Sequence, residues 1–208
     1  MSLMLKDVKL AVEGRPLLKS LSVDVPPGDV VTLMGPSGCG KSSLLAYICG
    51  TLDPAFTASG EVTLNGRGLK DLPVETRRVG ILFQDDLLFP HMSVGENLGF
   101  GLPSAVKGTA RHARIAAALR EADLEGFADR DPATLSGGQR SRVSLMRVLL
   151  SAPEALLLDE PFARLDVTLR QQIRAFVFSH ARASGLPVLL VTHDEADAVA
   201  AGGPVISL

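Results

Sequence analysis

The chain of 208 residues is long enough for one sizeable hydrophobic core and short for two independent ones. Hydrophobic residues make up 46% and charged residues 21% of it, as in folded soluble proteins, and its formal net charge of -2 gives no basic excess that would favour nucleic acid. The N-terminus lacks the long apolar stretch of a signal peptide, and no apolar run approaches the roughly 20 residues of a membrane span. We therefore expect a soluble chain without a nucleic-acid partner.

Short apolar runs that alternate with helical patterns favour a mixed α/β fold. In the first part of the chain, two antiparallel strands are predicted around the turn EGRP, and a buried strand is predicted to run directly into a glycine-rich loop. A helix follows this loop and ends at its terminal glycine, and an Asn-Gly pair then favours a hairpin. The predicted ranges are 5–12 and 21–25 for the antiparallel strands, 29–35 for the buried strand, 41–50 for the helix and 61–69 for the hairpin.

The rest of the chain predicts further strands and a helical insertion. After Gln84 the pattern changes, because residues 110–123 are alanine-rich and helical with no strand pattern nearby. The strands that flank this region are predicted over residues 77–83, 155–160 and 187–193. We expect a single domain over residues 1–208, with a mostly parallel sheet and an N-terminal antiparallel β-subdomain in residues 1–84 and 153–208, and an inserted α-helical subdomain in residues 85–152.

The two cysteines, Cys39 and Cys49, are not expected to form a disulfide. If residues 41–49 are helical, these ends lie roughly 12 Å apart at about 1.5 Å per residue, beyond the roughly 7 Å limit between the Cα atoms of a disulfide. Free thiols indicate a reducing compartment.

The sequence GPSGCGKS at residues 35–42 fits the pattern G-x-x-x-x-G-K-[ST] and lies between a predicted strand and a predicted helix, the context of a phosphate-binding loop. Its glycines let the backbone turn its N–H groups inward, and the following helix adds the positive end of its dipole. Lys41 can reach the β- and γ-phosphates, and the Ser42 hydroxyl can ligate Mg²⁺. A chance glycine turn is the alternative, which the flanking elements disfavour. The residues expected to contact ATP are Gly35, Pro36, Ser37, Gly38, Cys39, Gly40, Lys41, Ser42 and Ser43.

Two acids end the predicted strand LLLDEP at residues 156–161. Asp159 would hold Mg²⁺, directly or through water. Because side chains alternate along a strand, Glu160 is expected to point elsewhere and to be free to polarise an attacking water as a general base. Two solvated acids at a strand end would be the simpler interpretation if no phosphate loop were present.

Gln84 and His193, each at a strand end, are further candidates. Gln84 could touch Mg²⁺ or water and sense the γ-phosphate, and His193 could hydrogen-bond that phosphate. A polar boundary residue and a helix-entry residue are the ordinary alternatives, so both roles depend on the other motifs. No zinc site is expected, because the remaining histidines lack metal-ligand spacing with acids or cysteines; they are His91, His112 and His180.

In this order the motifs resemble those of ATP-binding cassette ATPases over nearly the whole chain: the phosphate loop, Gln84, LSGGQ at 135–139, LLLDEP, LD at 165–166 and His193. The resemblance implies ATP and Mg²⁺ as cofactors and two cassettes packed head to tail, in which each LSGGQ closes on the γ-phosphate held by the partner. An LSGGQ that opens a helix would stabilise an anion arriving from outside; a glycine-rich helix cap is the alternative. The residues implied to contact the partner's ATP are Ser136, Gly137, Gly138, Gln139 and Asp166.

Two departures from the family pattern affect binding. The family commonly has Ser-Ala before Leu-Asp, where this chain has Ala163 and Arg164, so one hydrogen bond across the dimer interface, worth about 1 kcal/mol, is in doubt. The aromatic residue with which the family stacks on adenine would fall at Val12, and residues 1–46 contain no aromatic residue or histidine. Valine offers the base an apolar contact without a π-face.

LLFPHMSVGENLGFGL at residues 87–102 resembles the segment after the glutamine in importer ATPases for polyamines, maltose, ferric iron, sulfate and thiamine. The resemblance implies a groove near Phe89, Pro90, His91 and Met92 that receives a coupling helix of the membrane-spanning permease; packing inside the helical subdomain is the alternative. It also implies a homodimer, or a dimer on two permease subunits, at the cytoplasmic face of the inner or plasma membrane. The transported substrate is not indicated.

Other functions remain as alternatives. A soluble cassette protein would carry fused cassettes, coiled coils or basic arms, which the sequence does not show, and an exporter-type cassette is also considered. A phosphotransferase has no use for LSGGQ. The chain closes with PVISL at residues 204–208, which is predicted to be a core strand. The regulatory domain that follows the cassette in maltose and sulfate proteins is either lacking or part of a longer chain.

Overall fold

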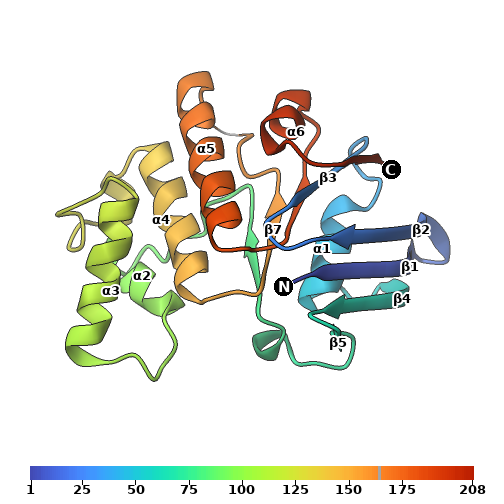
Figure 1. Cartoon of the computed structure of the whole chain (residues 1–208), viewed down its shortest axis with the longest axis horizontal. Coiled ribbons are helices and arrows are strands. Elements are labelled where there is room, and N and C mark those ends of the chain that lie inside the picture. Colours follow the sequence, from blue (N-terminus) through green and yellow to red (C-terminus); the bar gives the residue numbers. More distant parts are fainter. Residues whose placement is uncertain (164) are drawn as a thin grey trace. The chain divides into compact units, whose positions relative to one another are not determined.

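A computed structural model describes residues 1–163 and 165–208 of the chain (Figure 1). The described residues separate into two compact units. Residues 1–81, 154–160 and 174–208 form the first, called the sheet unit, and residues 82–153 and 161–173 form the second, called the helical unit. Residues 161–173, which were expected in the core, therefore group with the helices.

The sheet unit begins with a four-stranded antiparallel sheet in the order β2-β1-β4-β5. In β1, buried and exposed side chains alternate apart from an irregularity at Asp7, whose φ is 48°. The turn Asn65-Gly66 has positive φ at both residues and joins β4 to β5, which confirms the predicted hairpin. The strands are β1 (Leu3–Val12), β2 (Arg15–Val25), β4 (Phe56–Leu64) and β5 (Arg67–Gly68).

A five-stranded sheet in the order β6-β7-β8-β3-β9 forms the rest of this unit. The pairs β7–β8, β8–β3 and β3–β9 are parallel, and the inner strands are buried and mostly apolar, as is usual for parallel sheets covered on both faces. The strands are β3 (Val30–Met34), β6 (Val79–Leu82), β7 (Ala155–Asp159), β8 (Val188–Val191) and β9 (Val205–Ser207). The prediction of a core strand at the C-terminus was wrong in one respect, since β9 is an edge strand in which Val205 is exposed.

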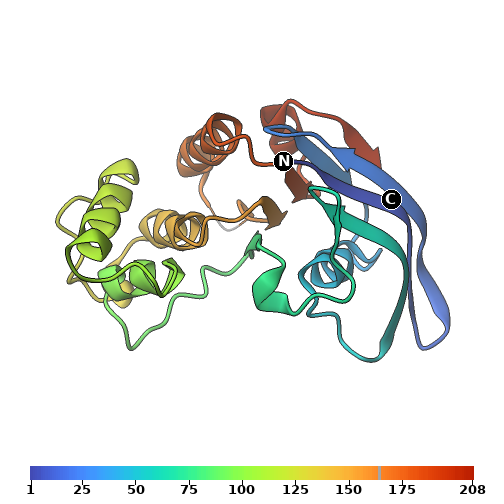
Figure 2. The same ribbon diagram turned by 60° about the horizontal axis from the view of Figure 1, so that its bottom comes forward.

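The core of the sheet unit lies between the two sheets and α1 (Lys41–Cys49). Figure 2 shows α1 against the inner face of the curved antiparallel sheet. Leu44, Leu45 and Ile48 of α1 are almost fully buried in this cluster. The helix ends at Gly50, which adopts a left-handed conformation with φ 84°, as the sequence predicted. Both cysteines are free thiols.

Helices α2, α3 and α4 pack on one another in the helical unit, on the left of Figure 1. The helices of the chain after α1 are α2 (Val94–Gly101), α3 (Gly108–Glu121), α4 (Gly137–Leu150), α5 (Val167–Ala183) and α6 (Glu195–Ala201), with short 3-10 turns at Val74–Thr76 and Pro132–Thr134. Within the described part of the chain, none of these helices has the length and apolar character needed to cross a membrane.

Candidate functional site

The glycine-rich loop lies between β3 and α1, as the sequence predicted. Gly38 and Gly40 have φ values of 82° and 94°, in the left-handed region that L side chains rarely adopt. A Cβ atom on Gly40 would also lie 2.9 Å from Cγ of Leu17 on β2, so that this leucine would have to shift. The positive φ is therefore the main reason why the loop needs glycine at Gly40.

Lys41 opens α1 and turns back over this loop. Its side chain is buried, and Nζ donates to the carbonyl oxygens of Gly35 at 2.7 Å and Pro36 at 2.9 Å. Sγ of Cys39 lies 3.8 Å from the same nitrogen. These acceptors are neutral, and a phosphate oxygen that carries a negative charge would bind the ammonium group more strongly. A phosphate bound at the loop can therefore replace these carbonyl oxygens as the acceptor of the Lys41 ammonium group.

The candidate metal ligands Ser42 and Asp159 are in contact although they lie 117 residues apart in the chain. Ser42 Oγ donates to Asp159 Oδ1 at 3.1 Å, where the end of β7 reaches the first turn of α1. Burial raises the pKa of Asp159, and this effect exceeds the opposing effect of the hydrogen bond from Ser42. A hydroxyl and a carboxylate are the hard oxygen ligands that Mg²⁺ prefers, so these residues fit the cation implied by the sequence.

Glu160 lies beyond the end of β7, and its backbone has a φ of 46°. For a residue other than glycine, such a conformation costs on the order of 1–3 kcal/mol. Its Oε1 lies 3.0 Å from Nδ1 of His193, which follows β8. The sequence predicted only that Glu160 points elsewhere than Asp159; in the structure a left-handed turn beyond the strand end sets its direction. The structure brings the candidate base and the candidate γ-phosphate ligand together.

The loop that carries His193 is held by its neighbours. Thr192 is buried, and its backbone N–H donates to Leu33 O at 3.2 Å. Asp194 caps α6 by accepting from the backbone N–H of Ala196 at 2.8 Å. His193 itself is exposed, with 64% of its side chain open to solvent.

The LSGGQ segment belongs to the helical unit, where Ser136 caps α4 as expected for a helix opening. Ser136 Oγ accepts from the backbone N–H of Gln139 at 3.3 Å, and Gln139 Oε1 accepts from the backbone N–H of Ser136 at 2.9 Å. Gly137 and Gly138 form the first turn, where helix N–H groups have no preceding carbonyl partner. A Cβ atom at Gly138 would overlap the end of the Leu169 side chain, which would have to shift to admit it.

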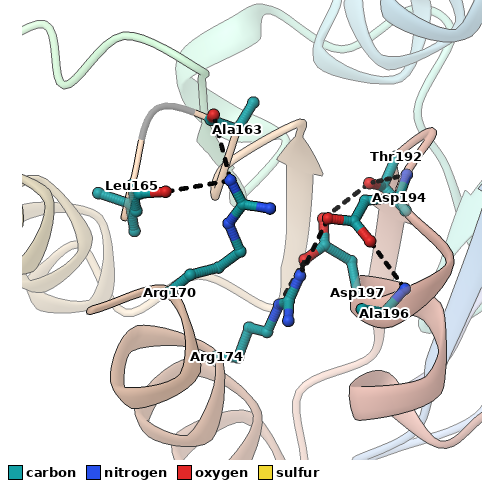
Figure 3. Close-up of polar contacts among 8 residues, drawn as sticks. All are labelled: Ala163, Leu165, Arg170, Arg174, Thr192, Asp194, Ala196 and Asp197. Atoms are coloured by element: carbon teal, nitrogen blue, oxygen red, sulfur yellow. Dashed lines mark hydrogen bonds and ion pairs between the residues drawn. The ribbon is translucent and has the colours of Figure 1, made fainter. Parts of the chain in front are cut away.

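Two other predicted site residues have different surroundings. Asp166 caps α5, because its Oδ1 accepts from the backbone N–H of Leu169 at 3.0 Å. Gln84 is exposed just after β6. Arg164 lies outside the described residues, while the carbonyl oxygens of Ala163 and Leu165 accept from Arg170 at 3.5 and 3.0 Å (Figure 3).

The segment before α2 is fixed by one buried amide. Asn97 accepts from the backbone N–H of Phe89 at 2.8 Å and donates to the carbonyl oxygens of Phe89 and Met92, each at 3.1 Å. A groove of about 400 Å³ lies beside Met92 and Phe100. Pro90 and His91 are exposed but do not line it, so only one of the four residues expected at a groove does so.

Val12, the position of the absent aromatic residue, ends β1. In the pairing of β1 with β4 it lies directly opposite Phe56, which is partly exposed. Side chains of directly opposed residues lie on the same face, with Cβ atoms about 5 Å apart. An aromatic ring is therefore next to Val12, although it comes from another strand. The sequence gives no sign of this role for Phe56, because the residue follows the phosphate loop whereas the family pattern points to the strand before it.

Comparisons with known proteins place the chain in a family. The family model described as ABC transporter matches residues 18–163. The uncharacterized ABC transporter ATP-binding protein YnjD of Escherichia coli K12 is 52% identical over 195 residues, which cover 94% of this chain and 90% of YnjD. The ATP-binding cassette MJ0796, solved as a dimer bound to ADP and Pi in a post-hydrolysis state, has a TM-score of 0.81 and 32% identity over 99% of this chain and 94% of that chain.

Several longer relatives are named as ATP-binding proteins of import systems. The spermidine/putrescine import ATP-binding protein PotA of Oleidesulfovibrio alaskensis is 41% identical over 190 residues, 91% of this chain. The Fe(3+) ions import ATP-binding protein FbpC of Pasteurella multocida is 38% identical over 205 residues, 98% of this chain. The chain spans 50% of the length of that PotA and 58% of that FbpC.

Proposed function

Since the chain belongs to the ABC transporter family as one of its ATP-binding cassette ATPases, we propose that it hydrolyses ATP to drive import through a membrane-spanning permease. The observation that carries the hydrolytic part is the pairing of Ser42 with Asp159 beside the pairing of Glu160 with His193. A cation site and a candidate base thus occupy consecutive positions at the end of β7. The import names of the longer relatives support the transport part.

The phosphate loop would hold the triphosphate. We assign the backbone N–H groups of residues 35–43 and the ammonium of Lys41 to the phosphate oxygens, with Lys41 exchanging its two carbonyl acceptors for charged ones. Ser42 and Asp159 would hold Mg²⁺, which neutralises charge on the phosphates when bound. The roles expected of Gln84 stay predictions.

Glu160 and His193 would act on the attacking water and the γ-phosphate. Glu160 accepts a proton from the water as general base, and its carboxylate is placed for this by the turn at positive φ. Nδ1 of His193 faces Glu160, which leaves Nε2 on the opposite edge of the ring for the γ-phosphate. Donation from both nitrogens at once requires the protonated ring.

Other members of the family stack an aromatic residue at the position of Val12 on the adenine of ATP. In this chain, adenine would stack on Phe56 instead. The strand register places Phe56 opposite Val12, and Val12 is also paired with Arg15, two residues before the Leu17 that touches the phosphate loop. We propose that a nucleotide whose phosphates lie in this loop places its base at these strand ends. Phe56 supplies the π-face that valine lacks.

LSGGQ would receive the γ-phosphate of a second copy. The capping box leaves the N–H groups of Gly137 and Gly138 for an anion, and Ser136 Oγ, which accepts from Gln139, still has its own proton to donate. Gln139 and Asp166 complete the set assigned to the partner's ATP.

The groove beside Met92 would seat the permease at the cytoplasmic face of the membrane. The groove has both apolar and charged walls, which suits an amphipathic helix of a membrane subunit, and Asn97 holds the segment that carries Met92 by hydrogen bonds to its backbone. The test is co-purification of the chain with membranes from cells that express its permease. We expect Met92→Glu to release it, whereas Val74→Glu, at an exposed apolar residue of the sheet unit, should not. Retention of the Met92→Glu protein would contradict the placement of the groove.

A further inference from the structure

The loop that presents His193 is attached to a buried arginine of α5. Arg174 Nε donates to Asp197 Oδ1, and the guanidinium also contacts Asp194 Oδ2 at 3.3 Å. Asp197 is 2% exposed and Arg174 8%. Figure 3 shows the guanidinium pointing from α5 at the two carboxylates. A planar fork with two acceptors fixes direction as well as distance.

The same carboxylates hold the backbone on both sides of His193. Asp197 Oδ2 accepts from Thr192 Oγ1 at 2.8 Å, and Thr192 Oγ1 in turn accepts from the backbone N–H of Asp194 at 3.1 Å. The residue before His193 and the residue after it therefore both belong to one hydrogen-bonded cluster with Arg174. His193 alone of the three projects into solvent, towards Glu160.

We propose that Arg174 is a positioning residue for ATP hydrolysis, which acts through Asp194 and Asp197 to hold His193 at its place beside Glu160. This inference rests on the proposed function, in which His193 contacts the γ-phosphate. Arg174 touches neither His193 nor Glu160 in the described contacts. Its effect on turnover passes through the loop, where a displacement of about 1 Å can cost about 100-fold in rate.

Removing Arg174 by itself would leave Asp197 as a buried, unpaired charge and could unfold the protein. The test therefore uses the double variant Arg174→Met/Asp197→Asn, which removes both charges and keeps an oxygen that accepts from Thr192. Replacing both charges of a buried pair is often close to neutral for stability. The control is Arg182→Met, because Arg182 also joins α5 to α6, through Ala201 O at 2.8 Å, but lies outside the cluster.

Single-turnover hydrolysis, ATP affinity and thermal unfolding are measured for each variant, alone and combined with His193→Ala. We expect the double variant to stay folded, to bind ATP as the natural protein does, and to lose about 10- to 100-fold in rate. In the His193→Ala background the same substitutions should cause no further loss, since they act through the missing side chain. The single variant Arg174→Lys should hydrolyse ATP faster than the double variant and more slowly than the natural protein. Arg182→Met should keep the natural rate.

Two outcomes would overturn the inference while leaving the proposed function intact. One is an equal rate loss with and without His193, which indicates a structural role. The other is a natural rate in the folded double variant while His193→Ala is slow. A natural rate in His193→Ala itself would remove the proposed role of His193 and the inference with it.

Discussion

The phosphate loop and the LSGGQ segment are both glycine-rich helix openings, yet they differ in what holds their polar groups. In the phosphate loop, Lys41 is a buried positive charge, and Ser42 donates a hydrogen bond to Asp159 at the end of β7. In LSGGQ, Ser136 and Gln139 bond to each other within three residues. The first region contains a cation, a carboxylate and backbone donors, whereas the second offers neutral donors only. A site of the second kind suits a phosphate whose charge is balanced elsewhere, as in the ATP of a partner.

The largest effect that separates the two regions is expected at Lys41. Lys41→Ala removes the positive charge from the phosphates, and such a contribution is worth roughly 3–4 kcal/mol, or a few hundred-fold in turnover. Steady-state ATP hydrolysis measures it. Lys9→Ala, at an exposed lysine paired with Asp7, is the control and should keep its activity. Activity of Lys41→Ala close to that of the natural protein would show that the loop is not catalytic.

The helix behind the phosphate loop is fixed at its other end by Arg77, and this support is expected to matter for stability. Arg77 is 7% exposed and donates to the carbonyl oxygens of Tyr47, Ile48, Leu72 and Lys70 at 2.9 to 3.2 Å. Arg77→Met leaves buried carbonyls without a donor, and we expect a loss of about 2–4 kcal/mol in the free energy of unfolding.

Urea unfolding checks this prediction against Arg78→Met. Arg78 is the next residue, but its partner Glu154 lies at the surface with it, so the loss there should stay below about 1 kcal/mol. Equal losses in the two variants would refute a special role of Arg77.

The features that could be predicted from the sequence are those determined by residues close together in the chain. The loop, the hairpin at Asn65-Gly66 and the capped start of α4 depend on residues that are close in the chain. Contacts that join distant segments left no such signal. Arg77 and the cluster of Arg174 look like ordinary charged residues in sequence, and the link from Glu160 to His193 arises from a left-handed turn that no glycine marks. The edge position of β9 likewise follows from strand order, which apolar content does not reveal.

The smallest expected effect concerns the base. Base–aromatic stacking is worth roughly 1–3 kcal/mol, so Phe56→Leu should weaken ATP binding about 5- to 150-fold with little change in turnover at saturation. Val12→Tyr should tighten binding of ATP several-fold and restore part of the loss in the Phe56→Leu background. Titrations with ATP and GTP measure both, with Phe127→Leu in the helical unit as the control. Unchanged affinity in Phe56→Leu, with natural binding unimproved by Val12→Tyr, would show that another group holds the base.

Light scattering of the Glu160→Gln protein tests most directly whether the second region serves a partner. This variant should keep ATP and Mg²⁺ but lose the base, so ATP stays uncleaved between two copies. We predict a dimer at millimolar ATP that disappears with ADP and in the Ser136→Arg combination, while Ser93→Arg, which disrupts the equivalent capping box of α2, leaves it intact. A Glu160→Gln protein that binds ATP but stays monomeric, or a dimer that survives Ser136→Arg, would contradict the account.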